Sequence, residues 1–431
     1  MILAIRLSNF YSIKEEICID FRAGKINTAT SRKLSSHIFT WNDEVVLKSI
    51  GLFGANASGK SNIIKAITFC CHLVLESHLF NENSVFNFEP FKFDGWENTP
   101  STFSMDFVYE GIEYEYSFSL TKHGILQESL YYYPKGKKAK VFTRDERTKG
   151  EKAKKYSFAD RLIPNPLDIA HSTSEKTLYV SRGSQMDREI CKTVFRFYMN
   201  EITLGLVPDS SEASFALFEK NKDLVVYALN ICDSDIVDIK AQREQVMNVG
   251  PSIVRRPDSS ALASASVQVL KRERVRFVTY HAKAPTIPFD LESEESSGTY
   301  RLFLMLLTLI DVVRSNKTFF LDEFDASLHS ILSQFILDLF HASSSAQFLY
   351  SSHDTNLINL DSLRRDQILF VRKQSNSSTE VYSLYDYKDF RENMDAEKGY
   401  LQGRFDAVPI VQSSVEVIKK LLGNSEDGLN G

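Results

Sequence analysis

Two adjacent carboxylates, Asp322 and Glu323, follow a run of apolar residues in the segment FFLDEFDASLH. Such a pair at the end of a buried strand is compatible with two kinds of role. The acids can cap the strand and face solvent, or one can hold a metal ion while the other accepts a proton from water. The second role requires a phosphate group, so the rest of the sequence decides between them.

A phosphate-binding loop is predicted at residues 54–61, where GANASGKS matches the pattern G-x-x-x-x-G-K-[ST] in full. Apolar residues 45–53 predict a buried strand before it, and the apolar spacing over 63–75 predicts a helix after it. Glycines let successive backbone N–H groups face phosphate oxygens, and the helix N-terminus adds positive potential. The residues expected to contact the nucleotide are Gly54, Asn56, Ala57, Ser58, Gly59, Lys60, Ser61 and Asn62.

This loop favours the catalytic interpretation of the two carboxylates. Lys60 is expected at the β- and γ-phosphates, and Ser61 is expected to hold Mg²⁺ together with Asp322. Glu323 is then placed to polarise the attacking water as a general base. The sequence therefore predicts a site for ATP and Mg²⁺ in which Ser61 and Asp322 are the metal ligands.

Three weaker signals accompany these motifs. The segment ESSGT at 295–299 precedes an apolar helix, where it can bind an anion or simply cap the helix. Asp325 follows the acidic pair, and His353 follows the apolar strand in AQFLYSSHD. A lone histidine after a strand is more often structural than catalytic, so His353 depends on its neighbours for a functional interpretation.

Seven blocks spread along the chain carry a family resemblance: NFYSIKEE, GANASGKSNIIKA, EPFKFD, ESLYYYPKGKK, EESSGTYRLF, LDEFDASLH and YLQGRFDAVP. Their order resembles that of ABC-type ATPases. The sequence is similar to the RecF and SMC branch and more closely to the RloA-type ATPases linked to phage defence. That group also resembles the ATPase subunits of the Septu and PARIS systems.

The resemblance implies an α/β fold, with a RecA-like ABC-type core, an antiparallel β subdomain and a mostly helical insertion arm. It also implies an ATP-sandwich homodimer or a higher oligomer. In such a dimer, Ser296, Ser297 and Gly298 of one subunit complete the nucleotide site of the other. Asp325 is expected near the interface, and His353 is expected on the γ-phosphate side as a second catalytic residue.

Two departures from the family pattern leave questions open. The signature reads SSGT in place of SGGQ, so either Ser296 or Ser297 can make the phosphate contact. No clear Q-loop glutamine follows the phosphate-loop helix, so either residues 87–94 serve in its place or the coupling differs from that of the family.

The sequence divides into three predicted parts. Residues 1–160 form the N-terminal part of the ATPase core, including an antiparallel sheet predicted from the alternation over 101–134. Residues 161–270 form a short, mostly helical arm, because no heptads sustain a coiled coil and helical spacing continues to about 250. Residues 251–266 are expected to form a flexible loop, and 271–431 to complete the core.

Composition limits the classes of partner. The net charge is −5 over 431 residues, so nucleic-acid binding requires a local patch. Residues 135–156 contain ten Lys or Arg against three acids, which favours a solvated hairpin, a DNA or RNA contact, or an acidic protein partner. Five cysteines without a CxxC pair indicate reduced thiols, and no apolar run is long enough for a membrane span. We expect a cytoplasmic protein without a membrane partner.

Two functions share these motifs. The first is an ATPase subunit of a defence complex that controls a separately encoded effector, such as a nuclease. The second is a RecF-like ATPase for DNA repair or DNA-end binding. The segments EESSGTYRLF and YLQGRFDAVP favour the first function, whereas the missing Q-loop glutamine argues against a transporter motor.

Overall fold

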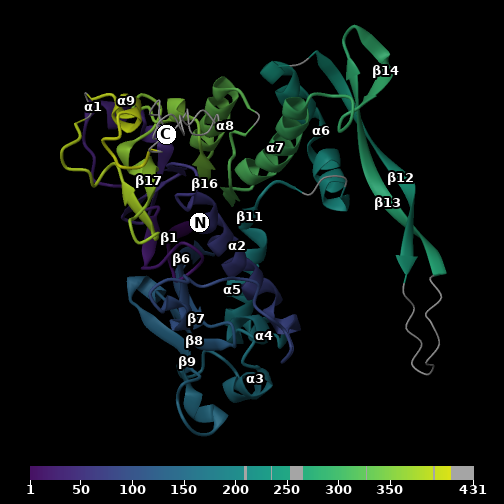
Figure 1. Cartoon of the computed structure of the whole chain (residues 1–431). Helices are drawn as coiled ribbons and strands as arrows, with labels where there is room; N and C mark the ends of the chain where they lie inside the picture. Colours follow the sequence, from purple (N-terminus) through teal and green to yellow (C-terminus); the bar gives the residue numbers. More distant parts are fainter. Residues whose placement is uncertain (208–210, 234, 253–265, 327, 392–393, 409–431) are drawn as a thin grey trace, which may run out of the picture.

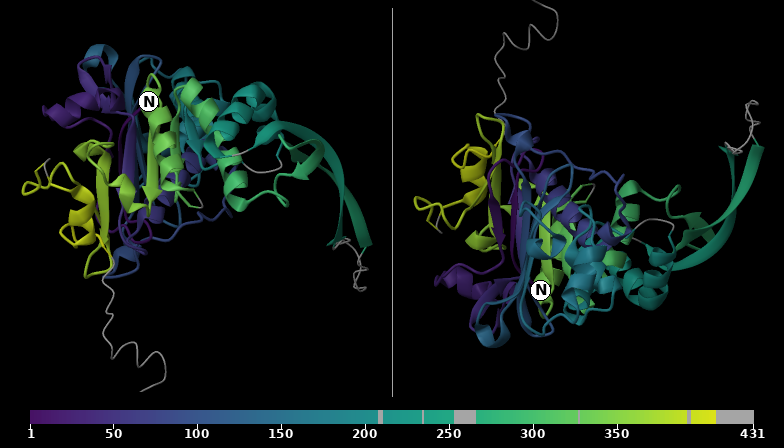
Figure 2. Two further views of the ribbon diagram at one scale, coloured as in Figure 1. Left: turned by 90° about the horizontal axis from the view of Figure 1, so that it is seen from above. Right: turned by 90° about the horizontal axis from the view of Figure 1, so that it is seen from below.

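The main parts of the described chain are two large sheets, a helix between them and a projecting arm (Figure 1). The computed structural model describes residues 1–207, 211–233, 235–252, 266–326, 328–391 and 394–408 of the 431 residues. Figure 2 shows the arm from above and below, standing away from the two sheets. Within the described residues, no helix is both long and apolar enough to cross a membrane.

The first sheet has seven antiparallel strands in the described chain, in the order β10-β9-β8-β7-β6-β1-β2. Its strands are β1 (Ile2–Ser8), β2 (Ile17–Asp20), β6 (Ser101–Tyr109), β7 (Ile112–Leu120), β8 (Ile125–Tyr132), β9 (Ala139–Asp145) and β10 (Tyr156–Phe158). The alternation over 101–134 correctly predicts β6, β7 and β8, since alternate side chains face the core. The sheet extends further than predicted, because β1 pairs with β6 and β9 pairs with β8.

The second sheet carries the phosphate-binding loop and has the order β11-β15-β16-β5-β17-β18. Its strands are β5 (Ser49–Phe53), β11 (Ile202–Leu204), β15 (Thr318–Leu321), β16 (Gln347–Ser352), β17 (Ile368–Lys373) and the antiparallel edge strand β18 (Thr379–Ser383). Every residue of β5, β15 and β16 is buried, as expected for central strands of a parallel sheet with both faces covered.

The single strand predicted over 45–53 is wrong in its first half. Residues Glu44–Leu47 form β4, which pairs with β3 (Ile38–Trp41) in a separate two-stranded sheet. Only from Ser49 does the chain pair with β16, beginning at Phe348. The continuous apolar run 45–53 therefore contains parts of two strands that belong to different sheets. Hydrophobicity alone does not show where the first strand ends and the second begins.

Helix α2 (Lys60–Glu76) lies between the two sheets (Figure 1). The largest buried apolar cluster joins it to both, with Ile67 of α2, Phe103 of β6 and Leu349 of β16 among its members. Fully burying each such side chain contributes about 1.5–3 kcal/mol, so this packing fixes the N-terminus of α2 at the loop. The other helices of the core and its flank are α1 (Ala29–Lys33), α3 (Pro166–Ser172), α4 (Tyr179–Gln185), α5 (Glu189–Asn200), α8 (Ser330–Ala342) and α9 (Ala396–Leu401).

The arm differs from the predicted short helical insertion. Its helix α6 (Glu212–Asp233) is followed by a long antiparallel pair, β12 (Ile236–Ser252) and β13 (Ser266–His281), and by β14 (Ala284–Asp290). The chain then enters α7 (Ser297–Arg314), which packs against α6. The helical prediction is wrong beyond Asp233, because the chain there forms strand β12 and pairs with β13. Most of the loop predicted at 251–266 lies outside the described residues.

Candidate nucleotide-binding and hydrolysis site

The phosphate-binding loop has the backbone that its glycines and small residues permit. Ala57 and Gly59 adopt positive φ angles of 61° and 112°. A Cβ at Gly54 would lie 2.1 Å from the carbonyl oxygen of Val371, and a Cβ at Gly59 would lie 2.0 Å from Thr379 Oγ1. A side chain is therefore excluded at both positions by the neighbouring strands, and at Gly59 also by the backbone conformation.

The ammonium group of Lys60 points back into this loop. Its Nζ donates hydrogen bonds to the carbonyl oxygens of Gly54 at 2.7 Å and Ala55 at 3.1 Å. Burial lowers the pKa of Lys60 to about 8, while the charges of the three nearby carboxylates act in the opposite direction. The loop thus holds one buried cation ready for an anionic ligand. The carboxylates that act on it are Asp322, Glu323 and Asp325.

A second contact braces the loop from the C-terminal part of the chain. The backbone N–H of Ala55 donates to the carbonyl oxygen of Ala407 at 2.7 Å. Tyr400 and Phe405, on the same segment, stack on Phe370 of β17. The YLQGRFDAVP block therefore has a structural role beside the phosphate loop.

One hydroxyl of the adjacent strand contacts both acidic residues at the end of β15, Asp322 through its carboxylate and Glu323 through its backbone N–H. Ser351 Oγ donates to Asp322 Oδ1, and the Glu323 N–H donates to Ser351 Oγ at 2.8 Å. Because β15 and β16 are parallel neighbours, the residues at their carboxyl ends meet at the same edge of the sheet. The carboxylate of Asp322 and the backbone of Glu323 are thus oriented together.

One pocket of about 650 Å³ collects much of the predicted site. Glu323 and His353 line it opposite the loop residues 56–62. These groups follow β15, β16 and β5, three adjacent parallel strands. The arrangement places an exposed carboxylate and an imidazole beside the phosphate-binding loop, which suits binding of a nucleoside triphosphate and hydrolysis of its phosphoanhydride bond.

Asp325 faces the main chain behind His353. Its Oδ2 accepts hydrogen bonds from the backbone N–H groups of His353 at 3.2 Å and Asp354 at 3.0 Å. Its Oδ1 is buried and has no hydrogen-bond partner within the described residues. Asp325 thus orients the segment that carries His353 and does not line the pocket itself.

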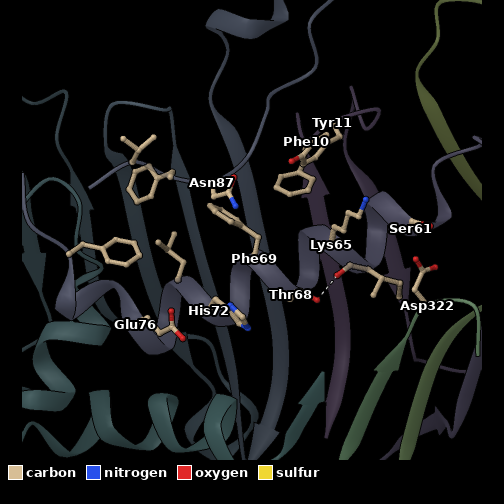
Figure 3. A pocket seen from close by; sticks show the side chains of 15 residues that line it. Phe10, Tyr11, Ser61, Lys65, Thr68, Phe69, His72, Glu76, Asn87 and Asp322 are labelled. Atoms are coloured by element: carbon tan, nitrogen blue, oxygen red, sulfur yellow. Dashed lines mark hydrogen bonds between the residues drawn. The ribbon is translucent and has the colours of Figure 1, made fainter. Parts of the chain in front are cut away.

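Ser61 and Asp322 share a neighbouring groove of about 460 Å³ along α2 (Figure 3). In Figure 3 they lie together at one end, with Phe69 and Asn87 further along and His72 and Glu76 at the other end. A hydroxyl and a carboxylate suit Mg²⁺, which takes few protein ligands and keeps water and phosphate oxygens. The donor set therefore fits the metal. Asn87, from the segment expected to replace the Q-loop, opens onto the same groove.

The residues of the signature lie elsewhere in the chain. Ser296 caps α7, and its Oγ accepts a hydrogen bond from the Thr299 N–H at 3.0 Å. Ser297 and Gly298 follow in the first turn. None of the three lines the pocket of the phosphate loop or the groove in the described structure.

The signature is also tied to the base of the arm. The Glu295 carboxylate accepts a hydrogen bond from Thr279 Oγ1 of β13 and lies 2.8 Å from His281 Nε2. Asp235 lies 2.7 Å from the other ring nitrogen of His281. Hydrogen bonding to Asp235 and Glu295 raises the pKa of His281 above its usual value of 6.5.

The match to a family model covers residues 49–359, more than half of the chain. The model is described as "AAA domain, putative AbiEii toxin, Type IV TA system". The chain belongs to this family. The matched range includes the phosphate loop, the acidic pair, His353 and the arm. The family model, whose description names a putative AbiEii toxin, therefore covers both the P-loop core and the arm.

Solved structures of SMC heads are similar over most of the chain. The SMC head domain from Thermotoga maritima has a TM-score of 0.41 and 11% identity, covering 89% of this chain and 98% of that one. The Smc head bound to the C-winged helix domain of ScpA has a TM-score of 0.38 and 14% identity, covering 89% and 97%. No protein with a curated description matches.

The predicted α/β core with an antiparallel β subdomain is confirmed in the described residues, whereas the predicted arm is only partly helical, because β12, β13 and β14 follow α6. Sequence reasoning missed two residues of the site, Ser351 and Arg301. The SSHD stretch, which begins in the last two residues of β16, offered a weak signal for Ser351. Nothing in the sequence singled out Arg301, whose Nη2 donates to the carbonyl oxygen of Glu323 at 2.7 Å.

The basic stretch at 135–156 is largely engaged within the chain. Arg144 is buried and bonded to Glu146, and Lys155 also pairs with Glu146. The other basic residues with internal partners are Lys138, Lys140, Arg147 and Lys152. Six of the ten basic side chains are thus used internally, which favours the solvated-hairpin interpretation over a nucleic-acid contact.

Proposed function

We propose that this chain is a Mg²⁺-dependent ATPase that dimerises around ATP and controls a separate effector, such as a nuclease, in an RloA-like defence system. The observation that carries the proposal is the pocket in which the phosphate loop, Glu323 and His353 meet. Packing alone does not require an exposed carboxylate and an imidazole to converge on a glycine-rich loop. Beside a phosphate-binding loop, a carboxylate can accept the proton of the attacking water and an imidazole can contact a phosphate oxygen.

The phosphate chain would bind at the loop and at Lys60. With a pKa of about 8, Lys60 is mainly protonated at neutral pH, and a polyphosphate would favour its charged form further. Backbone N–H groups of residues 56–62 and the N-terminus of α2 add positive potential without titrating. The ligand therefore replaces contacts that Lys60 now makes with carbonyl oxygens.

Ser61 and Asp322 would hold Mg²⁺, which when bound neutralises charge on the phosphate oxygens. Glu323 would accept the proton of the attacking water, because its carboxylate is exposed to the pocket and sits beside the loop. His353, on the same pocket, would contact the terminal phosphate. Asp325 holds the backbone of His353 in place for this contact.

A second copy would complete the site. Ser296, Ser297 and Gly298 are remote from the pocket of their own chain, yet they begin an 18-residue helix. The first N–H groups of a helix lack intrahelical partners and attract anions. In a homodimer these groups would close on the nucleotide of the other subunit, which explains why one chain shows an incomplete site.

The arm is our candidate for the surface read by the effector. Its base is joined to the signature through Glu295, Thr279 and His281, so a shift of α7 on nucleotide binding reaches the hairpin. ATP can change the shape of the chain only through differential affinity for two states, and closure of the composite site supplies such a difference. The family description favours this role over a RecF-like repair function.

The proposal is tested by three measurements on the purified full chain. Wild type should hydrolyse ATP with Mg²⁺ and associate on addition of ATP, whereas Lys60→Ala should do neither. The product of the adjacent gene should co-purify with wild type. Hydrolysis no faster than that of Lys60→Ala would refute the ATPase. Stimulation by DNA ends, without an effector bound, would favour the repair alternative.

A further inference from the structure

Glu323 occupies a strained backbone conformation at the centre of the proposed site. Its φ angle is +48°, in the left-handed region that costs energy for a residue with a Cβ. Such a conformation persists only where the surroundings hold it. Here the peptide groups on both sides of Glu323 are held, one by Ser351 and one by Arg301.

Arg301 belongs to the helix that carries the signature. It lies in the second turn of α7, shortly after Ser296 and Gly298. Its guanidinium donates to the carbonyl oxygen of Glu323 at 2.7 Å, a charge-assisted hydrogen bond within one chain. One end of α7 would therefore touch the partner's nucleotide, while its next turn holds the backbone of Glu323 in its own site.

The hydrogen bonding of Arg301 differs from that of a structural arginine. Arg144, buried in the first sheet, bonds through Nε, Nη1 and Nη2 to side chains and carbonyl oxygens. Arg301 makes the single bond to Glu323 in the described structure, and its buried Nε has no partner. A guanidinium with one bond and an unsatisfied buried donor is suited to exchange partners when α7 moves.

We propose that Arg301 is a positioning residue that couples occupation of the partner's nucleotide site to the orientation of Glu323 in its own site. The coupling rests on the proposed function, since it requires the signature to act across a dimer. When the N-terminus of α7 binds the partner's phosphate, Arg301 is fixed and the Glu323 carbonyl with it. A movement of α7 that breaks the Arg301 bond would leave the strained backbone held by Ser351 alone.

The test compares Arg301→Gln and Arg301→Lys with Arg314→Gln, a control at the far end of the same helix. In Arg301→Gln, kcat should fall about tenfold, equivalent to about 1.4 kcal/mol in the barrier, with the KM for ATP unchanged. Arg301→Lys should recover part of the rate, because an ammonium group can donate to the same carbonyl oxygen. The control should keep the wild-type rate.

A dimer readout separates this inference from the proposed function. ATP-dependent association of Arg301→Gln should equal that of wild type, and the pH dependence of kcat should keep its shape, since no titrating group is removed. If wild type exceeds Lys60→Ala in turnover but Arg301→Gln matches wild type, the positioning role is wrong and the ATPase stands. An equal loss in Arg314→Gln, or an Arg301→Lys no faster than Arg301→Gln, would also overturn it.

Discussion

The nucleotide-binding core and the arm are built on opposite principles. In the core, β5, β15 and β16 are wholly buried, and the chemistry lies where they end. In the arm, β14 is mostly exposed, and ion pairs such as Arg276 with Asp290 lie at the surface. Surface pairs contribute only about 0–1 kcal/mol each, so the arm is held less firmly than the core.

This difference separates two tasks. A buried parallel sheet fixes reacting groups relative to each other, whereas an exposed hairpin offers backbone and side chains to another molecule. Helix α7 joins the two regions, because Leu306 packs in the apolar cluster of the arm while Leu309 packs in the cluster of the core strands. Variants that affect one region and spare the other test whether this division holds.

The largest expected effect is loss of ATP binding in Lys60→Ala. Removal of the buried ammonium takes away the main point charge on the phosphates, so affinity should fall at least about a hundredfold. Isothermal titration with a non-hydrolysable ATP analogue measures it. Lys283→Ala, an exposed lysine of the arm, is the control and should bind as wild type does. An unchanged affinity in Lys60→Ala would rule out the phosphate loop.

Glu323→Gln should retain ATP and lose hydrolysis, because an amide keeps the shape but cannot accept the proton. A general base contributes about 10²–10⁴-fold to the rate, and the loss should be of this order. Size-exclusion chromatography should show the ATP-bound dimer accumulating. Turnover at the wild-type rate would remove Glu323 from this role.

A smaller signal is expected from mixed subunits. Lys60→Ala and Gly298→Asp should each be inactive alone, but their heterodimer retains one intact composite site. At equal mixing, about a quarter of the wild-type ATPase rate should return if pairing is random. Activity that never exceeds the sum of the separate variants would contradict the shared-site dimer.

The smallest effect concerns the link between arm and signature. Because Asp235 and Glu295 raise the pKa of His281, its stabilising charge is complete below pH 6.5 and is lost as pH rises through the raised pKa. The Tm of wild type should exceed that of His281→Gln by about 1–3 °C near pH 6, and the gap should shrink towards pH 9. A gap that widens with pH would contradict the charge-based link.

Sequence patterns were most informative where local chemistry sets the structure. The phosphate loop was predictable because Gly54, Gly59 and Lys60 meet backbone and charge requirements that few other residues satisfy. The presence of that loop favoured a catalytic role for Asp322 and Glu323. The alternation of apolar and polar residues predicted β6, β7 and β8. These features depend on residues that are close together in the sequence, so they can be recognised from one sequence alone.

Other features depend on partners remote in sequence. Helical spacing past Asp233 did not reveal that β13 would draw the chain into a hairpin, and Leu47 gave no sign that it pairs away from β5. Ser351 and Arg301 act through contacts with the backbone of Glu323, which leave no pattern of residue types. Tertiary pairing therefore decided what local propensity left open.

The order of strands in the second sheet also bears on how the site appears during synthesis. β5 emerges early, but both of its neighbours, β16 and β17, are encoded far downstream, and Glu323 and His353 come with the late strands. Long-range parallel pairing forms slowly and only after both strands are made. A nascent chain thus carries the phosphate loop without its hydrolytic groups. On the proposed function, ATP turnover would require Glu323 and His353, so it would begin only after β15, β16 and β17 have been synthesised and paired.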